Sequence, residues 1–249
     1  MSGQSDDLLK THVPWRVVFY PRLPSTMDKA WILLGQKKQE GIVVSTRDQY
    51  QGRGRNGKTW LGKPGHSLAF SVTLCPTADK LLLLTPAFSL ALARCFQAIQ
   101  DSNVGIKWPN DIFLDGKKVA GILVETVWQG SEVNMVLGIG INLTLDMNEF
   151  TEIQNKATSL QDHTDQPIEI KLLETRILVE LQRVYTLVQN GWSPVPEWRE
   201  YLTTIGQWVK IRQGSSIYEG KVIDVDASAR LLLEDRSGNI TPIASGELL

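Results

Sequence analysis

The sequence has little of what disulfide-rich and metal-binding proteins need. Its 249 residues include two cysteines, Cys75 and Cys95, and three widely separated histidines, His12, His66 and His163. Two cysteines cannot build a disulfide framework or a cysteine-rich zinc site, and histidines this far apart lack the spacing of a metal motif. The sequence therefore predicts neither a disulfide-stabilised fold nor a resident zinc ion.

The sequence also lacks an excess of charge and a long apolar run. Its 26 basic and 27 acidic residues give a net charge of −1, whereas a dedicated duplex-DNA binder usually has a basic excess. The first 13 residues contain no apolar segment of the kind that signal peptides have. The most apolar stretch, residues 81–99, is interrupted by Pro86 and Arg94, so its uninterrupted runs are too short to span a bilayer. We expect a cytoplasmic protein that binds neither DNA nor membranes.

What is present is an ordinary globular composition, with 42% hydrophobic residues. Runs of strands and helices without a regular alternation favour an α+β fold with a mixed, largely antiparallel central sheet and flanking helices. We predict helices over residues 25–39, 85–100 and 168–189, and strands over residues 41–46, 67–74, 104–108, 111–115, 118–128 and 133–143. The second helix is expected to begin near Thr85, with Pro86 in its first turn.

The pattern changes after Trp198, where short apolar segments alternate with turn residues to the end of the chain. Such a series predicts a small β-structure, and we expect an SH3-like β-barrel. We place the domain boundary between a catalytic domain at residues 1–202 and this barrel at residues 203–249.

The segment QYQGRGRNGKTW, residues 49–60, matches two phosphate-binding patterns, GxGxxG and GxxxxGK[ST]. Both motifs work because the loop opens a helix whose N-terminal amides hold phosphate. Here the loop is followed by Gly62, Pro64 and Gly65 and then by a predicted strand, so we reject both interpretations.

The same segment is strongly basic. Five basic residues lie between positions 47 and 63 against Asp48 alone, namely Arg47, Arg53, Arg55, Lys58 and Lys63. The residues themselves leave three interpretations open. They are a plain surface loop, a nucleic-acid contact with Tyr50 and Trp60 as stacking partners, and a nucleotide-phosphate site.

Four further motifs occur in a fixed order around this loop. A Ser25-Thr26 pair at a predicted helix start precedes the loop motif GRGRNG (52–57). After the loop come KWPND (107–111), KVAGILVE (118–125) and GIGIN (138–142). Together they closely resemble the biotin protein ligase family, and the resemblance covers nearly everything after about residue 20. One departure is Asn56, which stands where arginine is common in the family.

The resemblance implies a biotin–[acetyl-CoA-carboxylase] ligase that uses ATP and Mg²⁺. Such an enzyme activates biotin to biotinyl-AMP, releases pyrophosphate, and transfers biotin to a lysine of a biotin carboxyl carrier protein. Some members carry a DNA-binding domain before the catalytic part, but only 24 residues precede Ser25, so we expect the ligase-only form, as a monomer or a homodimer. The alternatives are a lipoate-type ligase and a non-enzymatic nucleic-acid binder.

The resemblance assigns catalysis to Lys118, Asp111 and Arg53. Lys118 would offset negative charge at the biotin carboxylate and the α-phosphate, with Lys117 as its rival, and Asp111 would bring in Mg²⁺ with the phosphates. Neither step needs a protein nucleophile, and we expect no Ser/His/Asp or Cys/His grouping. Catalysis would then rest on positioning and charge neutralisation.

The resemblance also implies a set of residues that bind biotin and ATP. Ser25, Thr26 and Gln49 would hydrogen-bond the ureido ring, although Ser25 is also interpretable as a plain N-cap. Trp60 would cover the adenine, or else serve as a core tryptophan. The strand glycines would allow close approach of the ligand, or serve sheet packing. The full set is Ser25, Thr26, Met27, Gln49, Gly52, Arg53, Gly54, Arg55, Trp60, Lys107, Asn110, Lys118, Gly121, Gly138, Gly140 and Asn142.

Overall fold

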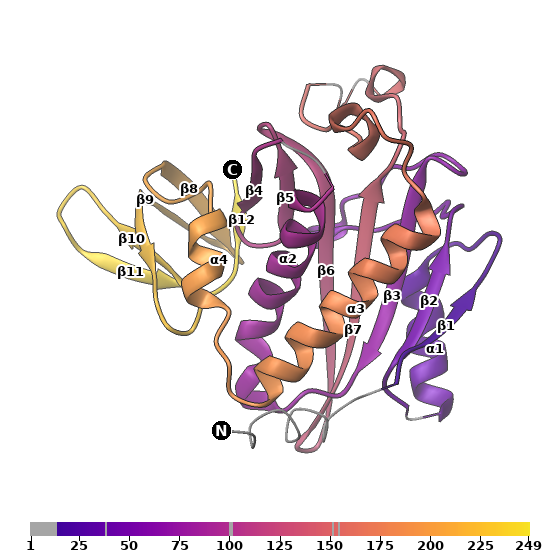
Figure 1. Cartoon of the computed structure of the whole chain (residues 1–249). Coiled ribbons are helices and arrows are strands. Elements are labelled where there is room, and N and C mark those ends of the chain that lie inside the picture. Colours follow the sequence, from indigo (N-terminus) through magenta and orange to yellow (C-terminus); the bar gives the residue numbers. More distant parts are fainter. Residues whose placement is uncertain (1–13, 38, 100–101, 151, 154) are drawn as a thin grey trace, which may run out of the picture.

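The structure is a computed structural model that describes residues 14–249 except 38, 100, 101, 151 and 154. The N-terminal segment that we interpreted as lacking a signal peptide, residues 1–13, lies outside this part. A central sheet of seven strands has the order β1-β2-β3-β7-β6-β5-β4 (Figure 1). The strands are β1 (Arg16–Phe19), β2 (Ile42–Thr46), β3 (Ser67–Leu74), β4 (Val104–Lys107), β5 (Asp111–Leu114), β6 (Lys117–Gln129) and β7 (Glu132–Asn142).

The strand pairing confirms the predicted mixed, largely antiparallel sheet. β1 pairs parallel with β2, and the remaining neighbours pair antiparallel. β1 was not predicted, because its four residues at the sheet edge carry no alternation, and three of them are exposed. β6 and β7 form the longest hairpin of the sheet, so the motifs KVAGILVE and GIGIN lie side by side on adjacent strands.

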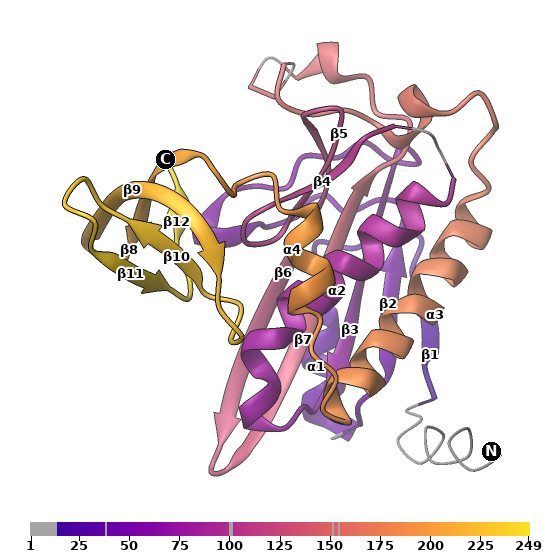
Figure 2. The ribbon, with the colours of Figure 1, turned by 60° about the vertical axis from the view of Figure 1, so that its left-hand side comes forward.

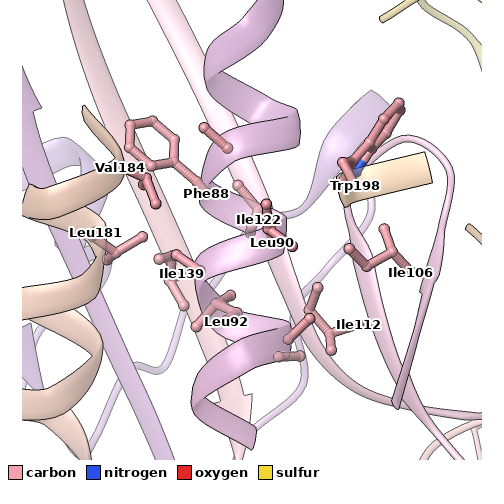
Figure 3. Packing of buried hydrophobic residues seen from close by; sticks show 14 of the residues in the cluster. Phe88, Leu90, Leu92, Ile106, Ile112, Ile122, Ile139, Leu181, Val184 and Trp198 are labelled. Carbon is pink, nitrogen blue, oxygen red and sulfur yellow. The ribbon is translucent and has the colours of Figure 1, made fainter. Parts of the chain in front are cut away.

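Two long helices cover one face of the sheet and bury the main core against it. They are α2 (Leu81–Gln97) and α3 (Ile170–Gln189), and the shorter α4 (Val195–Tyr201), which follows α3, packs against α2. Figure 2 shows these three helices on the same side of the sheet. Figure 3 shows Phe88, Leu90 and Leu92 of α2 packed with side chains of α3 and of the sheet. The helix predicted over residues 168–189 corresponds to α3, and its apolar residues Leu173, Ile177, Leu181, Tyr185 and Val188 are all buried.

The remaining long helix, α1 (Thr26–Lys37), covers the opposite face of the sheet. It begins where the sequence predicts, and the backbone N–H of Asp28 donates to Ser25 Oγ at 3.3 Å, which confirms the N-cap interpretation. A second, smaller core forms between this helix and the sheet, from Leu23, Met27, Ala30, Leu34, Ile42, Val44 and Val136. The first turn of α1 is therefore held close to β7.

The start of α2 differs from our prediction. The helix begins at Leu81, four residues before Thr85, so Pro86 lies inside it and not in its first turn. Leu84 in the added turn is fully buried, and burial of an apolar face stabilises a helix more than local propensity does. Proline removes the donor for the carbonyl of Leu82, but Leu82 is exposed, so water can satisfy that oxygen.

The C-terminal segment forms a second, antiparallel sheet of five strands in the order β11-β10-β9-β8-β12. These are β8 (Trp208–Gln213), β9 (Ser216–Val225), β10 (Leu231–Glu234), β11 (Ile240–Ile243) and β12 (Glu247–Leu248). Within residues 203–249 the end strands β11 and β12 do not pair, so the predicted barrel is not closed. The backbone N–H of Thr203, in the segment between α4 and β8, donates to the carbonyl of Ile106 on β4 at 3.0 Å. The boundary between residues 202 and 203 stays a prediction.

No helix in the described part of the chain is both long enough and apolar enough to cross a membrane.

The packing of α2 leads to a first prediction. Phe88 is fully buried between α2 and α3, whereas Phe19 at the edge of the sheet is 54% exposed. We expect Phe88→Ala to lower the free energy of unfolding by about 3–5 kcal/mol, through lost burial and a residual cavity. Phe19→Ala, the matched control, should change it by less than about 1 kcal/mol. Urea denaturation of both variants measures this, and equal losses would contradict the assigned core.

Candidate active site

A cavity of about 570 Å³ lies between the N-terminus of α1, the loop at residues 52–60, the β4–β5 turn and the strands β6 and β7. Its size is that of a small-molecule site. The residues that we predicted for catalysis and ligand binding all line it except Gly52. Gly52 lies behind the wall, where a Cβ would be 2.7 Å from Gln49 Nε2 and 2.8 Å from the Trp60 carbonyl oxygen. Motifs far apart in the sequence therefore converge on one cavity.

The floor of the cavity is a stretch of sheet without side chains. A Cβ at Gly138 would lie 2.5 Å from Met27 Sδ, and a Cβ at Gly140 would lie 2.4 Å from Trp60 Cε2. Real Cβ atoms do not approach other atoms so closely, so only glycine leaves room for Met27 and the indole. Trp60 is half-buried on this floor, and its ring N–H has no hydrogen-bond partner in the described part of the chain. The indole thus offers a ring face to the cavity, while its N–H is buried against Gly140 of β7.

A hydrogen-bonded chain of neutral groups forms one end of the cavity. The backbone N–H and the hydroxyl of Thr26 donate to Gln49 Oε1 at 2.8 and 3.1 Å, and the Ser71 hydroxyl donates to Thr26 Oγ1 at 2.8 Å. Ser71, on β3, is fully buried and was not predicted. Because Gln49 Oε1 is occupied, the Gln49 amide N–H₂ and a Thr26 lone pair are the groups left for a ligand.

Arg53 is held by carboxylates of the protein. Its guanidinium donates to both oxygens of Glu125 at 3.0 and 3.1 Å, to Ser25 Oγ at 3.2 Å, and also to Asp28. The hydrogen bond to Glu125 is the main cause that raises the pKa of Arg53. Burial alone would raise the pKa of Glu125, but hydrogen bonds from Arg53 and Trp31 lower it. The Arg53 side chain thus ties the loop to α1 and β6, and its charge is balanced.

Other basic residues of the loop are balanced in the same way. Lys58 pairs with Glu247 of β12, and Lys63 contacts both oxygens of Glu149 at 2.8 Å. The ion pair with Lys58 is the main cause that lowers the pKa of Glu247. Asn56 adds a hydrogen bond to Glu247 Oε2 at 3.2 Å, and its φ of 56° lies in the left-handed region that asparagine tolerates better than arginine. The basic excess in the sequence is therefore largely neutralised by distant acidic residues.

Arg55 differs from its neighbours, because it makes no ion pair with a described carboxylate. Its guanidinium donates to Asn110 Oδ1 at 3.2 Å and to the Gly246 carbonyl at 2.8 Å. Burial lowers the pKa of Arg55, while the charges of Asp111 and Glu247 nearby oppose that shift. A partly buried guanidinium bound to neutral oxygens is well prepared to receive an anion.

Lys118 and Asp111 meet at the same end of the cavity. The Lys118 ammonium lies 2.7 Å from Asp111 Oδ1 and 5.3 Å from the centre of the Trp60 ring. Lys117 is exposed and does not line the cavity, because successive side chains on a strand point to opposite faces. Of the two rival lysines, Lys118 is the one at the site.

The described residues offer few ligands for a metal ion. No group of three or more His, Cys, Asp or Glu side chains that could hold a metal occurs among the described residues. Asp111 contributes one carboxylate, and its Oδ1 already contacts Lys118. Magnesium is commonly held by one or two carboxylates together with substrate phosphates. The described residues therefore fit a Mg²⁺ ion that arrives with a nucleotide.

One wall of the cavity was missed by sequence reasoning. Glu152, Ile153, Lys156 and Ala157 line it, and they belong to a segment without a recognisable motif. The backbone N–H of Lys118 donates to the Lys156 carbonyl at 2.9 Å, so this wall adds a short parallel bridge to β6. Residues 151 and 154 of the segment lie outside the described part.

A Ser/His/Asp grouping was not expected, but one occurs outside the cavity. His163 Nδ1 lies 2.9 Å from Ser102 Oγ and 3.2 Å from Asp115 Oδ2. The three residues are far apart in the sequence, so no local pattern could indicate their contact. Serine and aspartate approach the same ring nitrogen, whereas a hydrolytic triad needs them on opposite nitrogens. The group is therefore not a nucleophile site.

Comparison with known proteins places this geometry in a family. Residues 19–142 match the family model described as the biotin/lipoate A/B protein ligase family. The bifunctional ligase/repressor BirA of Bacillus subtilis (strain 168) is 32% identical over 239 residues, which are 92% of this chain and 73% of the relative. The biotin–[acetyl-CoA-carboxylase] ligase of Paracoccus denitrificans is 28% identical over 227 residues, 86% of this chain and 88% of the relative.

Solved structures agree in fold. The biotin protein ligase from Aquifex aeolicus in complex with biotin and ATP superposes with a TM-score of 0.79 at 24% identity, covering 94% of this chain and 97% of that chain. The match includes the second, C-terminal sheet, because it extends over nearly the whole length of both chains.

The Arg53 contacts lead to a second prediction. We expect Glu125→Gln to loosen the loop, because glutamine keeps the shape of the side chain but removes the charge that holds the guanidinium. Trypsin should then cleave after Arg53 several times faster, as measured by mass spectrometry of timed digests. Glu132→Gln, at the exposed start of β7, is the matched control. Equal cleavage rates in both variants would show that Glu125 does not restrain the loop.

Proposed function

The chain belongs to the biotin/lipoate A/B protein ligase family, and we propose that it is a biotin–protein ligase. In the first step of this reaction the biotin carboxylate attacks the α-phosphate of ATP, and pyrophosphate leaves. In the second step a lysine amine of the carrier protein attacks the mixed anhydride, which gives an amide and AMP. The first step transfers an adenylyl group to biotin, and the second transfers the biotinyl group to the lysine. Neither step needs a covalent enzyme intermediate.

One observation carries the proposal. A single cavity has a neutral hydrogen-bonding end at Thr26 and Gln49 and a cationic end at Arg55 and Lys118, with a glycine floor between them. This order of environments matches biotinyl-AMP, whose uncharged bicyclic ring and anionic phosphate are joined by an apolar chain. A ligand that has only one of these parts would leave the other end of the cavity empty.

The neutral end is suited to a ureido group. The Gln49 amide can donate to the ureido oxygen, and Thr26 Oγ1 can accept from a ureido N–H, because its own proton is directed to Gln49. The buried Ser71 hydroxyl fixes this direction by donating to Thr26. The apolar side chain of Met27 lies beside them against Gly138, where the valerate chain would run.

The cationic end is suited to the reacting phosphate. Arg55 would bind a phosphate oxygen, since no carboxylate of the described residues forms an ion pair with it. Lys118 would offset the charge that develops as the biotin carboxylate attacks. Arg53 would act by closing the loop, because Glu125 and Asp28 already neutralise it. Asp111, Lys107 and Asn110 line the same end, and Asp111 would hold a nucleotide-borne Mg²⁺, which supplies further positive charge to the phosphates.

The remaining cavity residues are suited to the nucleoside. The half-buried Trp60 offers its ring face to a base. Asn142 also lines the cavity, and its side-chain N–H is held in place by donating to the Thr158 carbonyl at 3.1 Å.

The partner and the compartment follow from the proposed reaction. A relative is named biotin–[acetyl-CoA-carboxylase] ligase, which supports a carboxylase carrier domain as the protein substrate. The near-neutral charge of the chain favours a protein over a nucleic acid as partner. Such carriers and ATP are met in the cytoplasm, where we place the protein.

The direct test is exchange of labelled pyrophosphate into ATP. The first step is reversible, so a biotin ligase should catalyse this exchange when biotin is present and not when biotin is omitted. Lipoate and RNA in place of biotin serve as controls. Exchange with lipoate alone would indicate a lipoate ligase, and exchange with none of the three would contradict an adenylate-forming function.

A variant pair leads to a third prediction. We expect Lys118→Ala to bind biotin nearly as well as the unaltered chain but to lose at least about 100-fold in the rate of exchange, which is the scale of one lost electrostatic donor. Lys117→Ala, the neighbour whose side chain is outside the cavity, should retain the rate. Calorimetry for biotin and the exchange assay measure the two effects. The opposite result for the two lysines would overturn the assignment.

A further inference from the structure

The imidazole of His163 joins three segments just outside the cavity. Its side chain is 11% exposed, and the residue is the last of a short helical turn at Leu160–His163. Nδ1 meets Ser102, which precedes β4, and Asp115, in the turn between β5 and β6, while Nε2 lies 2.9 Å from Thr158 Oγ1. The nucleotide site as described above does not use this histidine.

The hydrogen bonds around the ring have a defined direction. Asp115 accepts the backbone N–H of Asn103 at 3.0 Å, and this bond is the main cause that lowers the pKa of Asp115. An ionised carboxylate can only accept, so Nδ1 of His163 carries a proton toward Asp115. With that proton on Nδ1, Nε2 is the acceptor of the ring, and the Thr158 hydroxyl donates to it. The second oxygen near this hydroxyl, Asp162 Oδ2, is farther away at 3.3 Å.

Thr158 in turn contacts two residues of the cavity. Its backbone N–H donates to the Lys118 carbonyl at 2.9 Å, and its own carbonyl accepts the side-chain N–H of Asn142 at 3.1 Å. Thr158 is 5% exposed, so water does not compete strongly for these bonds. A displacement of Thr158 would therefore shift the backbone of Lys118 and release the amide of Asn142 together.

We propose that His163 is a positioning residue for adenylate formation, because it holds Thr158, and Thr158 holds Lys118 and Asn142. The inference rests on the proposed function for its chemical meaning. The Lys118 ammonium acts only if it lies close to the carboxylate and the phosphate that react, and an error of about 1 Å in such a group can cost about 100-fold in rate. His163 touches no reacting atom and acts only through Thr158.

The experiment removes the bond from the threonine side. Thr158→Val keeps the shape of the side chain but removes the hydroxyl that donates to His163, and Thr158→Ser restores a hydroxyl. Thr144→Val is the matched control, because Thr144 Oγ1 lies 2.9 Å from Nδ1 of another histidine, His66, and among the described residues Thr144 makes no hydrogen bond to Lys118 or Asn142. His163→Phe removes the same hydrogen bond from the histidine side.

We expect Thr158→Val and His163→Phe to lower kcat of biotin-dependent pyrophosphate exchange by about tenfold or more, as a partial misplacement of Lys118 would. The KM for biotin should stay unchanged, because the Thr26–Gln49 end is remote. The KM for ATP should rise, because Asn142 is released. Thr158→Ser should recover most of kcat, and Thr144→Val should retain it.

A second readout separates this inference from the proposed function. The Lys118 amide is protected by its bond to the Lys156 carbonyl, so its hydrogen exchange should become faster in Thr158→Val and not in Thr144→Val. If the unaltered chain shows no biotin-dependent exchange of pyrophosphate, the proposed function fails, but the amide measurement still decides the positioning role. Unchanged amide protection and unchanged kcat in Thr158→Val, or equal losses in Thr158→Val and Thr144→Val, would overturn the inference.

Discussion

Two glycines on β7, Gly138 and Gly140, leave the α1 side of the central sheet without side chains where the cavity lies. The close approach of Met27 and Trp60 to the strand backbone requires this, since a Cβ at either glycine would overlap them. The other features of the site depend on the same constraint. The loop can fold down onto β6 and β7 only because the indole fits there. Arg55, which the loop carries, reaches the same cavity as Lys118 of β6 only because the loop is down.

Charge balance within the fold determines which cation is left for a ligand. The basic loop carries several positive charges, but Glu125, Asp28, Glu247 and Glu149 hold most of them through ion pairs. Such pairs at a half-exposed surface contribute little stability individually, and their effect here is geometric. They draw the loop toward α1, β6 and the C-terminal sheet, and within the described part of the chain they leave Arg55 bound to neutral oxygens. The C-terminal sheet thereby contributes Gly246 and Glu247 to the surroundings of a site built mostly from the central sheet.

Much of this could be predicted from the sequence, because the relevant signals are local. Alternation and apolar periodicity predicted β2, β3, β5, β6, β7 and α3, and the motifs predicted which residues line the cavity. The partners of those residues could not be predicted, since Glu125 is 72 positions from Arg53 and Glu247 is 189 from Lys58. Tertiary burial extended α2 beyond its predicted start, and the edge pairing of β1 and the open C-terminal sheet depend on contacts that no local pattern encodes. Ser71 and Thr158 were missed for the same reason, because a single buried hydroxyl leaves no periodic signal.

The site depends on the absence of side chains at Gly138 and Gly140 of β7, and Gly140→Ala tests this dependence most directly. One added methyl group would lie 2.4 Å from the rigid Trp60 ring, so it should displace the indole from the cavity floor while the fold is kept. Gly35→Ala, on α1, is the control, because a Cβ there meets nothing within 4 Å. We predict that Gly140→Ala loses biotin-dependent pyrophosphate exchange by at least about tenfold, as expected for a misplaced site, and that Gly35→Ala keeps it. Full exchange activity in a folded Gly140→Ala protein would contradict the account.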